Sequence, residues 1–203
     1  MSDICVLGNF VADNSFYAKK LPTKGETVFG TGFQIGPGGK GSNQAIAAAR
    51  LGSKVSFLGK IGDDANGKMA IELYKKNKID QQTIIISKEH PTGVAGLMIS
   101  KEDGTNAIIV CPGASMEITK DEVDKYSDLI TSCKVFLTQL EIKTEVTLHA
   151  LKLAKKGSAI TILNPAPAVK IEDEFFKYID FFTPNETEAQ FYFGKKIESY
   201  EEA

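Results

Sequence analysis

Short apolar runs alternate with amphipathic stretches along most of the chain. Runs bounded by polar residues or glycine predict buried strands at residues 4–7, 54–58, 135–140, 160–163 and 181–183. Apolar positions at helical spacing predict helices at residues 43–51, 67–76, 145–155 and 186–193. Helices that connect successive strands give a largely parallel sheet covered on both faces. The pattern therefore predicts one α/β domain over residues 1–203, a three-layer α/β/α, Rossmann-like fold with a mostly parallel sheet.

Two segments break this alternation, because strand patterns follow one another without a helix. They cover residues 14–36 and 92–110, approximately. The second contains two apolar stretches around the turn sequence 103–106, which is typical of a hairpin. We expect these strands to form a small antiparallel β lid outside the main sheet. An edge hairpin without a function is the alternative.

The amino-acid composition limits the kinds of molecule that the chain is expected to bind. The 203 residues are 42% hydrophobic and 25% charged with a formal net charge of −2, which favours neither nucleic acid nor a membrane surface. No apolar run reaches the ~20 residues of a membrane span. Cys5, Cys111 and Cys133 are widely spaced and lack a metal-binding pattern, as do His90 and His149. We expect a cytoplasmic protein with reduced cysteines.

The sequence GPGGKGSNQ at residues 36–44 leads directly into the alanine-rich predicted helix. Ser42 or Asn43 is the expected N-cap, and Gly52 the expected stop. Exposed peptide N–H groups and the positive helix end suit a hydroxylated or anionic ligand. A tight turn before a packed helix is the alternative, although it requires neither Lys40 nor the carboxamide of Asn43.

Two better-known glycine motifs fit this loop less well. A P-loop is excluded, because Gln34 stands where its first glycine belongs and Gly41 follows Lys40. The dinucleotide fingerprint is matched by letter at Gly36, Gly38 and Gly41. Asp63 and Asp64 follow at the distance of a ribose-binding acid, but the strand that should precede the fingerprint is short and flanked by glycine. An NAD-binding domain stays an alternative, and both aspartates otherwise read as surface charges.

Polar corners follow several of the predicted strands. They are Gly8 and residues 139–141, 164–165 and 184–185. Open parallel sheets bind ligands beyond the carboxyl ends of their strands. We therefore expect the ligand site at this edge, together with the glycine loop.

These motifs together resemble the ribokinase-like carbohydrate kinases. The resemblance rests on residues 38–45 followed by Gly52 and Gly62, and on residues 139–141, 164–168 and 183–188. It extends over essentially the whole chain and is strongest toward ribokinases and deoxyribokinases. The family implies transfer of the ATP γ-phosphoryl group to the terminal hydroxymethyl of a pentose such as ribose, with Mg²⁺ and a monovalent cation (K⁺) as cofactors. It also implies a homodimer formed through the lid sheet.

The resemblance also implies the site residues. Those for the sugar are Val11, Asp13, Gly38, Gly39, Lys40, Asn43, Ala95, Ile108 and Glu141, with Ala95 and Ile108 as lid residues. Asn185 and Glu188 match the motif near the ATP phosphates, and Glu188 is the expected Mg²⁺ ligand. An ionised Asp13 accepts hydrogen bonds from sugar hydroxyls, whereas Lys40 and Asn43 supply donors.

Val11 departs from the family pattern, because ribokinases usually carry Asn at this place. An apolar side chain cannot bind a sugar hydroxyl, so Val11 favours a deoxy sugar. Asn9, two residues earlier, is positioned in sequence to compensate. A 2-deoxyribose kinase is therefore the alternative to a ribose kinase.

The chain ends at Ala203, whereas the family continues well past this length. The Gly-Ala-Gly-Asp motif that carries the family's catalytic base is absent, so the chain contains no catalytic residue of its own. Residues 197–203 read as the start of a helix. We expect an N-terminal portion of a kinase that is inactive alone, and a truncated, non-catalytic sugar-binding module is the alternative.

Overall fold

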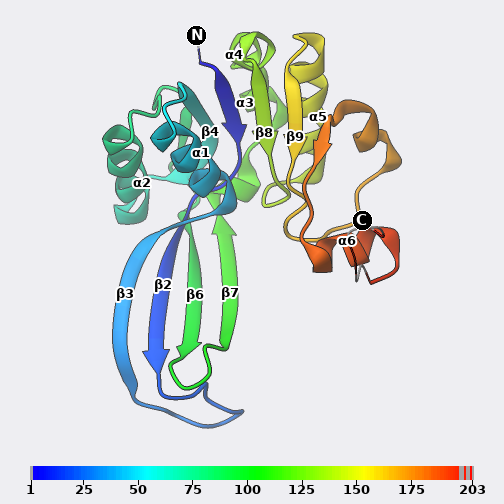
Figure 1. The fold of residues 1–203 in the computed structure, drawn as a ribbon. Helices are drawn as coiled ribbons and strands as arrows, with labels where there is room; N and C mark the ends of the chain where they lie inside the picture. The colour runs from blue at the N-terminus through cyan, green and yellow to red at the C-terminus, as the bar shows by residue number, and fades with distance from the viewer. Residues whose placement is uncertain (1, 197–198, 200–201, 203) are drawn as a thin grey trace.

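The computed structural model describes residues 2–196, 199 and 202. Its main sheet has the order β10-β9-β8-β1-β4-β5, and all neighbouring strands pair in parallel. The strands are β1 (Ile4–Leu7), β4 (Val55–Gly62), β5 (Ile84–Ser87), β8 (Val135–Thr138), β9 (Ile160–Leu163) and β10 (Phe181–Phe182). The carboxyl ends of these strands point toward the lid in Figure 1. The predicted parallel α/β fold is confirmed.

Helices cover both faces of this sheet. Helices α1 (Lys40–Arg50) and α2 (Ala65–Lys76) lie on one face, and α3 (Lys120–Asp124), α4 (Ser127–Ser132) and α5 (Thr144–Lys156) lie on the other. Helix α6 (Glu186–Phe193) follows β10, and the 3₁₀ turns are η1 (Ala114–Glu117) and η2 (Asp173–Tyr178). Side chains alternate along β1, so Cys5 and Leu7 pack in the core under α3, α4 and α5. Val6 packs in the opposite core with residues of α1 and α2.

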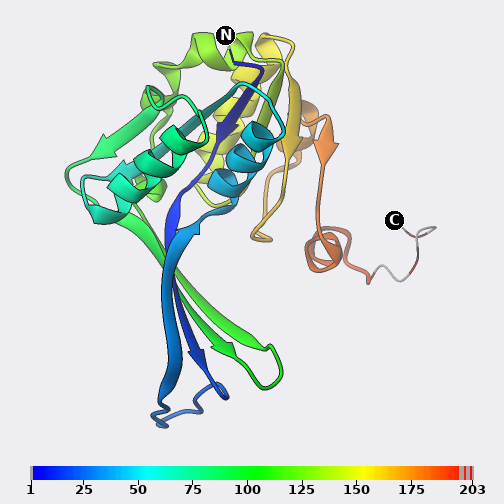
Figure 2. The ribbon, with the colours of Figure 1, turned by 60° about the vertical axis from the view of Figure 1, so that its left-hand side comes forward.

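The lid is a second, four-stranded sheet that extends away from the layered body (Figure 2). Its strands are β2 (Val11–Ala18), β3 (Gly30–Gly38), β6 (Thr92–Ser100) and β7 (Asn106–Gly113), in the order β3-β2-β6-β7. The two outer pairs are antiparallel but β2 and β6 are parallel, so the expected antiparallel lid is in fact mixed. Both central strands leave the body and run outward, which makes them parallel.

Helix α1 begins earlier than the sequence pattern predicts. Its N-cap is Gly39, with φ of 91°, and neither Ser42 nor Asn43 caps it. The expected helix start at 197–203 lies largely outside the described residues. No helix in the described part of the chain combines the length and the apolar character that crossing a membrane requires.

Candidate functional site

The lid brings several predicted sugar-site residues to one sheet face. Asp13 on β2 lies opposite Gly36 of β3 on one side and Ala95 of β6 on the other. Val11, two residues earlier, lies opposite Gly38 and therefore shares the face of Asp13. This face, which we call the inner lid face, continues directly into the glycine loop and the carboxyl end of β1.

Gly38 and Gly39 allow the loop to pass very close to these side chains. A Cβ on Gly38 would collide with the carboxyl group of Asp13. At Gly39, whose φ is positive, a Cβ would lie 2.8 Å from the backbone oxygen of Asn9. Local space therefore excludes a side chain at either glycine, and the backbone of Gly38 lies directly against the Asp13 carboxylate.

Glu141 connects the loop to the main sheet. Its Oε2 accepts a 2.8 Å hydrogen bond from the peptide N–H of Lys40, the first residue of α1. Its Oε1 lies 3.8 Å from Nζ of the same lysine. A side chain that follows β8 thus caps a helix 101 residues earlier in the chain. The capping group missing from the local sequence is supplied by tertiary structure.

Both carboxylates of the site are unusual acids. Burial raises the pKa of Asp13. Burial also raises the pKa of Glu141, assisted by the nearby charge of Asp13 and opposed by the amide and charge of Lys40. Two carboxylates that lie close together in partly dry surroundings are suited to accept hydrogen bonds from hydroxyl groups.

A layer of buried polar side chains supports the loop from beneath. Asn9 and Gln139 are each 1% exposed, and Asn9 Oδ1 and Gln139 Oε1 have no hydrogen-bond partner in the described structure. Gln139 donates through Nε2 to Gln44 Oε1 of α1, and a Cβ on Gly41 would meet its Oε1 at 2.8 Å. The sequence analysis placed Gln139 in the polar corner 139–141 but gave it no part in the site; it follows β8 and lies two residues before Glu141.

Asn9 is the residue expected to compensate for the apolar Val11. It is buried with its Oδ1 against Gly39, and its interaction with Glu141 is among the influences that lower the pKa of that carboxyl. Val11 is 4% exposed on the inner lid face. Asn9 therefore lies against the glycine loop, and its role as a substitute for a polar residue at position 11 stays a prediction.

The remaining predicted sugar residues lie farther out. Asn43 is exposed on the first turn of α1, where its N–H donates to Gly39 O at 2.9 Å. Ala95 is 3% exposed and lies opposite Val110, whereas Ile108 is 52% exposed and lies opposite Leu97. By this register both β7 residues share the inner lid face. Val110 was missed because the hairpin register depends on a turn whose exact residues the pattern left open.

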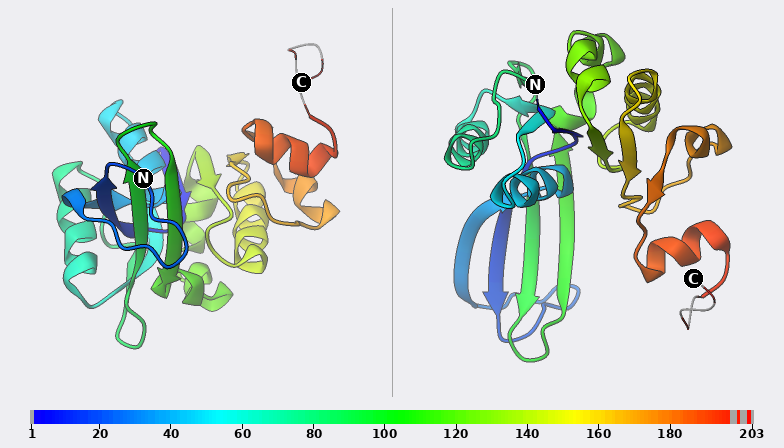
Figure 3. Two further views of the ribbon diagram at one scale, coloured as in Figure 1. Left: turned by 90° about the horizontal axis from the view of Figure 1, so that it is seen from below. Right: turned by 45° about the horizontal axis from the view of Figure 1, so that its top comes forward.

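The predicted phosphate residues occupy another part of the edge. Asn185 caps α6 by accepting from Glu188 N at 2.8 Å, and Asn185 N donates to Glu188 Oε2 at 2.9 Å. Asn185 Nδ2 donates to the other carboxylate oxygen at 3.2 Å, so this motif forms a closed capping box. Three strand spacings, roughly 14 Å, separate β10 from β1. Both views of Figure 3 show α6 set to one side of the body.

A protein-family model matches the chain along its whole length. The model of the pfkB family carbohydrate kinases matches residues 1–203. The chain belongs to the pfkB family of carbohydrate kinases. Its match to the family extends over the main sheet, the lid and the glycine loop alike.

Individual pfkB relatives agree with this assignment. The chain is 34% identical over 200 residues to a deoxyribokinase of Salmonella typhi, covering 98% of this chain and 65% of the relative. It is 37% identical over 194 residues to a ribokinase of Haemophilus influenzae, covering 96% and 63%. The structure of Arabidopsis thaliana ribokinase complexed with ribose and ATP superposes with a TM-score of 0.90 at 31% identity, covering 99% and 65%. The chain thus spans about two thirds or less of the length of these relatives.

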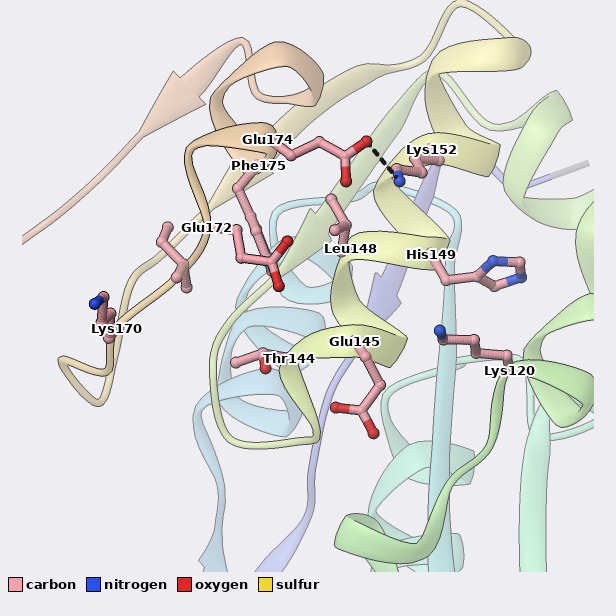
Figure 4. Close-up of a pocket in the computed structure, with 11 residues that line it drawn as sticks. Lys120, Thr144, Glu145, Leu148, His149, Lys152, Lys170, Glu172, Glu174 and Phe175 are labelled. Atoms are coloured by element: carbon pink, nitrogen blue, oxygen red, sulfur yellow. Dashed lines mark ion pairs between the residues drawn. The ribbon is translucent and has the colours of Figure 1, made fainter.

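A separate pocket lies away from the residues that the pfkB resemblance selects. It has a volume of about 570 Å³ and lies along the outer side of α5 (Figure 4). Its lining includes Lys120, Glu145 and an ion pair between Lys152 and Glu174 at 2.8 Å. Cationic and acidic side chains balance there, and none of the predicted site residues contributes. Among the described residues, no group of three or more His, Cys, Asp and Glu side chains is placed to hold a metal.

Proposed function

We propose that this chain is the sugar-binding portion of an ATP-dependent pentose kinase that phosphorylates the terminal hydroxymethyl group, with ribose as the first candidate. The observation that carries the proposal is the convergence of Asp13, Glu141 and Lys40 around the loop backbone of Gly38. Family membership and the ribokinase relatives support it.

Each of these residues has a distinct part in holding a sugar. Asp13 accepts hydrogen bonds from ring hydroxyls, and the glycine loop lies close enough to fix their direction. Lys40 presents an exposed ammonium beside Glu141, so the pair offers a donor and an acceptor together. Ala95, Val110 and Ile108 form an apolar strip that covers the ring and excludes water. Positioning of this kind supplies much of the rate enhancement in phosphoryl transfer.

ATP, Mg²⁺ and K⁺ belong to the proposal as cofactors. Glu188 is the candidate that would hold Mg²⁺ together with ATP phosphates, since Mg²⁺ commonly binds one or two protein carboxylates and retains waters. Its carboxylate is already bonded to Asn185 N and Nδ2, which leaves it able to accept through remaining lone pairs. When bound, Mg²⁺ neutralises charge on the phosphate oxygens.

Titration calorimetry tests the proposal on the 203-residue chain with ribose, 2-deoxyribose, fructose and NAD. We expect a pentose to bind, and we expect Asp13→Asn to weaken this binding by at least tenfold. Asp3→Asn is the matched control, because Asp3 pairs with Lys134 at the opposite end of the sheet. Binding of NAD without a pentose would instead support the dinucleotide-binding alternative and would sink the kinase proposal.

Val11 favours 2-deoxyribose as the second candidate substrate. It is apolar, 4% exposed and directly beside Gly38 on the inner lid face. Asn9, the residue expected to compensate, has its Oδ1 close to Gly39. A Val11→Asn variant should shift the affinity ratio toward ribose, and an unchanged ratio would remove position 11 from the determinants of specificity.

We also propose that these residues alone bind sugar without completing phosphoryl transfer. Support comes from the relatives, of which the chain covers 60–65% in the deoxyribokinase and mouse ribokinase matches. Measuring ATP turnover by the chain separates three outcomes. Turnover would contradict this statement, sugar binding without turnover would support it, and sugar binding that persists without turnover in the natural full-length protein would favour a non-catalytic module.

A cytoplasmic homodimer completes the proposal. The outer lid face, opposite Asp13, carries Phe16, Phe33, Ile35 and Ile109, which are 49–68% exposed. The rings of Phe16 and Phe33 lie 4.9 Å apart, and a pocket of about 480 Å³ adjoins them. Exposed apolar patches of this kind mark protein interfaces. Light scattering should give twice the 22.0 kDa chain mass.

A further inference from the structure

Asp64 has a place in the structure that the sequence pattern did not indicate. It is the N-cap of α2, and its Oδ1 accepts from Gly67 N at 2.8 Å. The same carboxylate also accepts two hydrogen bonds from Thr92, the first residue of lid strand β6. Thr92 N lies 2.7 Å from Oδ2, and Thr92 Oγ1 lies 2.8 Å from Oδ1.

Thr92 completes a tight junction between the body and the lid. Its hydroxyl accepts from Gly62 N at 2.8 Å, and the residue is 2% exposed. A Cβ on Gly67 would collide with the backbone oxygen of Gly62, and a Cβ on Gly62 would lie 2.5 Å from Thr92 N. The end of β4, the start of α2 and the start of β6 therefore meet with no space between them.

Strand β6 leaves the body at Thr92. The linker that precedes it, residues 88–91, is exposed. The end of β7 is tied to the same linker, because Ala114 N donates to Pro91 O at 2.8 Å. By contrast, β2 and β3 continue directly into β1 and α1. The hydrogen bonds that join Thr92 to Asp64 and to Gly62 therefore attach the β6–β7 half of the lid to the body.

This attachment lies close to the sugar-site residues. Gly93 follows Thr92 and lies opposite Val11, and Ala95 lies opposite Asp13. Three residues of extended strand, roughly 10 Å, separate Thr92 from Ala95. A shift of Thr92 would move the apolar strip relative to the Asp13 carboxylate.

We propose that Asp64 is a positioning residue of the sugar site: by holding Thr92, it fixes where β6 and Ala95 lie against Asp13. This inference rests on the proposed pentose-binding function. Asp64 touches no reacting atom, so its effect is on sugar affinity and on the order of the lid.

Pentose affinity and amide hydrogen exchange test this role in the 203-residue chain. In Asp64→Asn, an NH₂ group replaces one of the two carboxylate oxygens. In one orientation of the amide this donor faces Thr92 N, and in the other it faces Gly67 N, so a hydrogen bond is lost in either case. We expect pentose affinity to fall about tenfold, with faster exchange in residues 93–99 and 106–113. The matched control is Asp63→Asn, because the neighbouring Asp63 side chain is exposed and makes no hydrogen bond or ion pair within the described residues.

A pair of changes at Thr92 separates positioning from simple loss of stability. Thr92→Val removes the hydroxyl but leaves Asp64 capping α2, whereas Thr92→Ser retains the hydroxyl. We expect Thr92→Val to reproduce the affinity loss and Thr92→Ser to retain near-native affinity, at a temperature where all variants are folded. Native affinity in both Asp64→Asn and Thr92→Val would overturn the inference. Failure of the unaltered chain to bind any pentose would instead overturn the proposed function itself.

Discussion

The two ends of the candidate site carry glutamates in contrasting states. Glu141 bonds a single peptide N–H, lies beside an exposed lysine and has a pKa raised by burial. Glu188 accepts hydrogen bonds from Asn185 through both oxygens inside a capping box on α6. The Glu141 carboxylate can still accept hydrogen bonds from a ligand, whereas the Glu188 carboxylate is engaged in capping α6. Matching a family motif therefore does not by itself indicate how ready a side chain is to bind.

The largest effect should come from removing space at the sugar end. In Gly38→Ala, the new Cβ collides with the Asp13 carboxylate and displaces it. Two charge-assisted hydrogen bonds are worth about 3 kcal/mol or more, so we expect roughly a hundredfold loss of pentose affinity by calorimetry.

Gly36→Ala provides the control for this change. Gly36 is the residue of β3 that lies opposite Asp13, whereas Gly38 lies opposite Val11, and a Cβ on Gly36 would meet nothing within 4 Å. Its affinity should remain close to native. Equal losses in both variants would show that chain flexibility, rather than the space beside Asp13, determines binding.

A smaller loss is expected when the cation beside Glu141 is removed. Lys40→Ala deletes the ammonium group but keeps the peptide N–H that caps onto Glu141. We expect pentose affinity to fall about tenfold, the effect of one charged hydrogen bond. Lys134→Ala removes a lysine that pairs with Asp3 at 2.7 Å and should leave affinity unchanged. Native affinity in Lys40→Ala would remove this side chain from the site.

At the α6 end the expected effect is on stability. Asn185→Ala removes the side chain that accepts from Glu188 N and donates to Glu188 Oε1. We expect the free energy of unfolding in urea to fall by about 1 kcal/mol, the usual value of an N-cap. Pentose affinity should not change. A tenfold loss of pentose affinity would show that the two ends are coupled and would break the contrast drawn above.

The smallest effect should be a change in the pH dependence of stability. Because burial raises the pKa of Glu141, ionising it in the folded state is unfavourable. The contribution of Glu141 to the free energy of unfolding is fully present below the ordinary carboxyl pKa of 4.5. This contribution is lost as pH rises through the raised pKa of the folded state. Glu141→Gln keeps an acceptor for Lys40 N and should therefore show a smaller fall in unfolding free energy from pH 4.5 to 7.

Glu122 provides a control of opposite sign. Burial acts to raise its pKa, but hydrogen bonds from Lys60 and Thr119 hold that pKa below the usual range. The contribution of Glu122 to the free energy of unfolding is present above pH 4.5, the ordinary carboxyl pKa, and is lost as pH falls through the lowered pKa of the folded state. Glu122→Gln should therefore change the slope only on the acidic side. An identical slope in both variants would contradict the different environments of the two carboxylates.

The sequence predicted what depends on local pattern. Strands 4–7 and 160–163 and helix 186–193 match the structure at both ends, because alternation and helical spacing are contained in neighbouring residues. The start of α1 was misplaced because its capping group is Glu141, 101 residues away. Parallel pairing of β2 with β6 was missed for the same reason.

The residues of the candidate site also divide into those that the local sequence predicts and those that depend on tertiary structure. The glycine loop could be identified from its own letters, since its backbone needs are local. Asp64 reads as a surface charge in sequence, because its two hydrogen bonds from Thr92 cross 28 positions. Gln139 and Val110 depend on which strands become neighbours, and no short stretch of sequence contains that information.

The pairing of β2 with β6 also has a consequence for synthesis on the ribosome. Asn14 Nδ2 donates to Ala95 O across 81 positions of the chain. At ~5–20 residues per second, the ribosome needs roughly 4–16 s to make the residues between them. In the later part of that interval, after residues 30–38 have been made, the β2–β3 ribbon can form with one edge unpaired, and Phe16 lies on β2. The edge of β2 therefore stays open to misassociation until β6, residues 92–100, has been made and can pair with it.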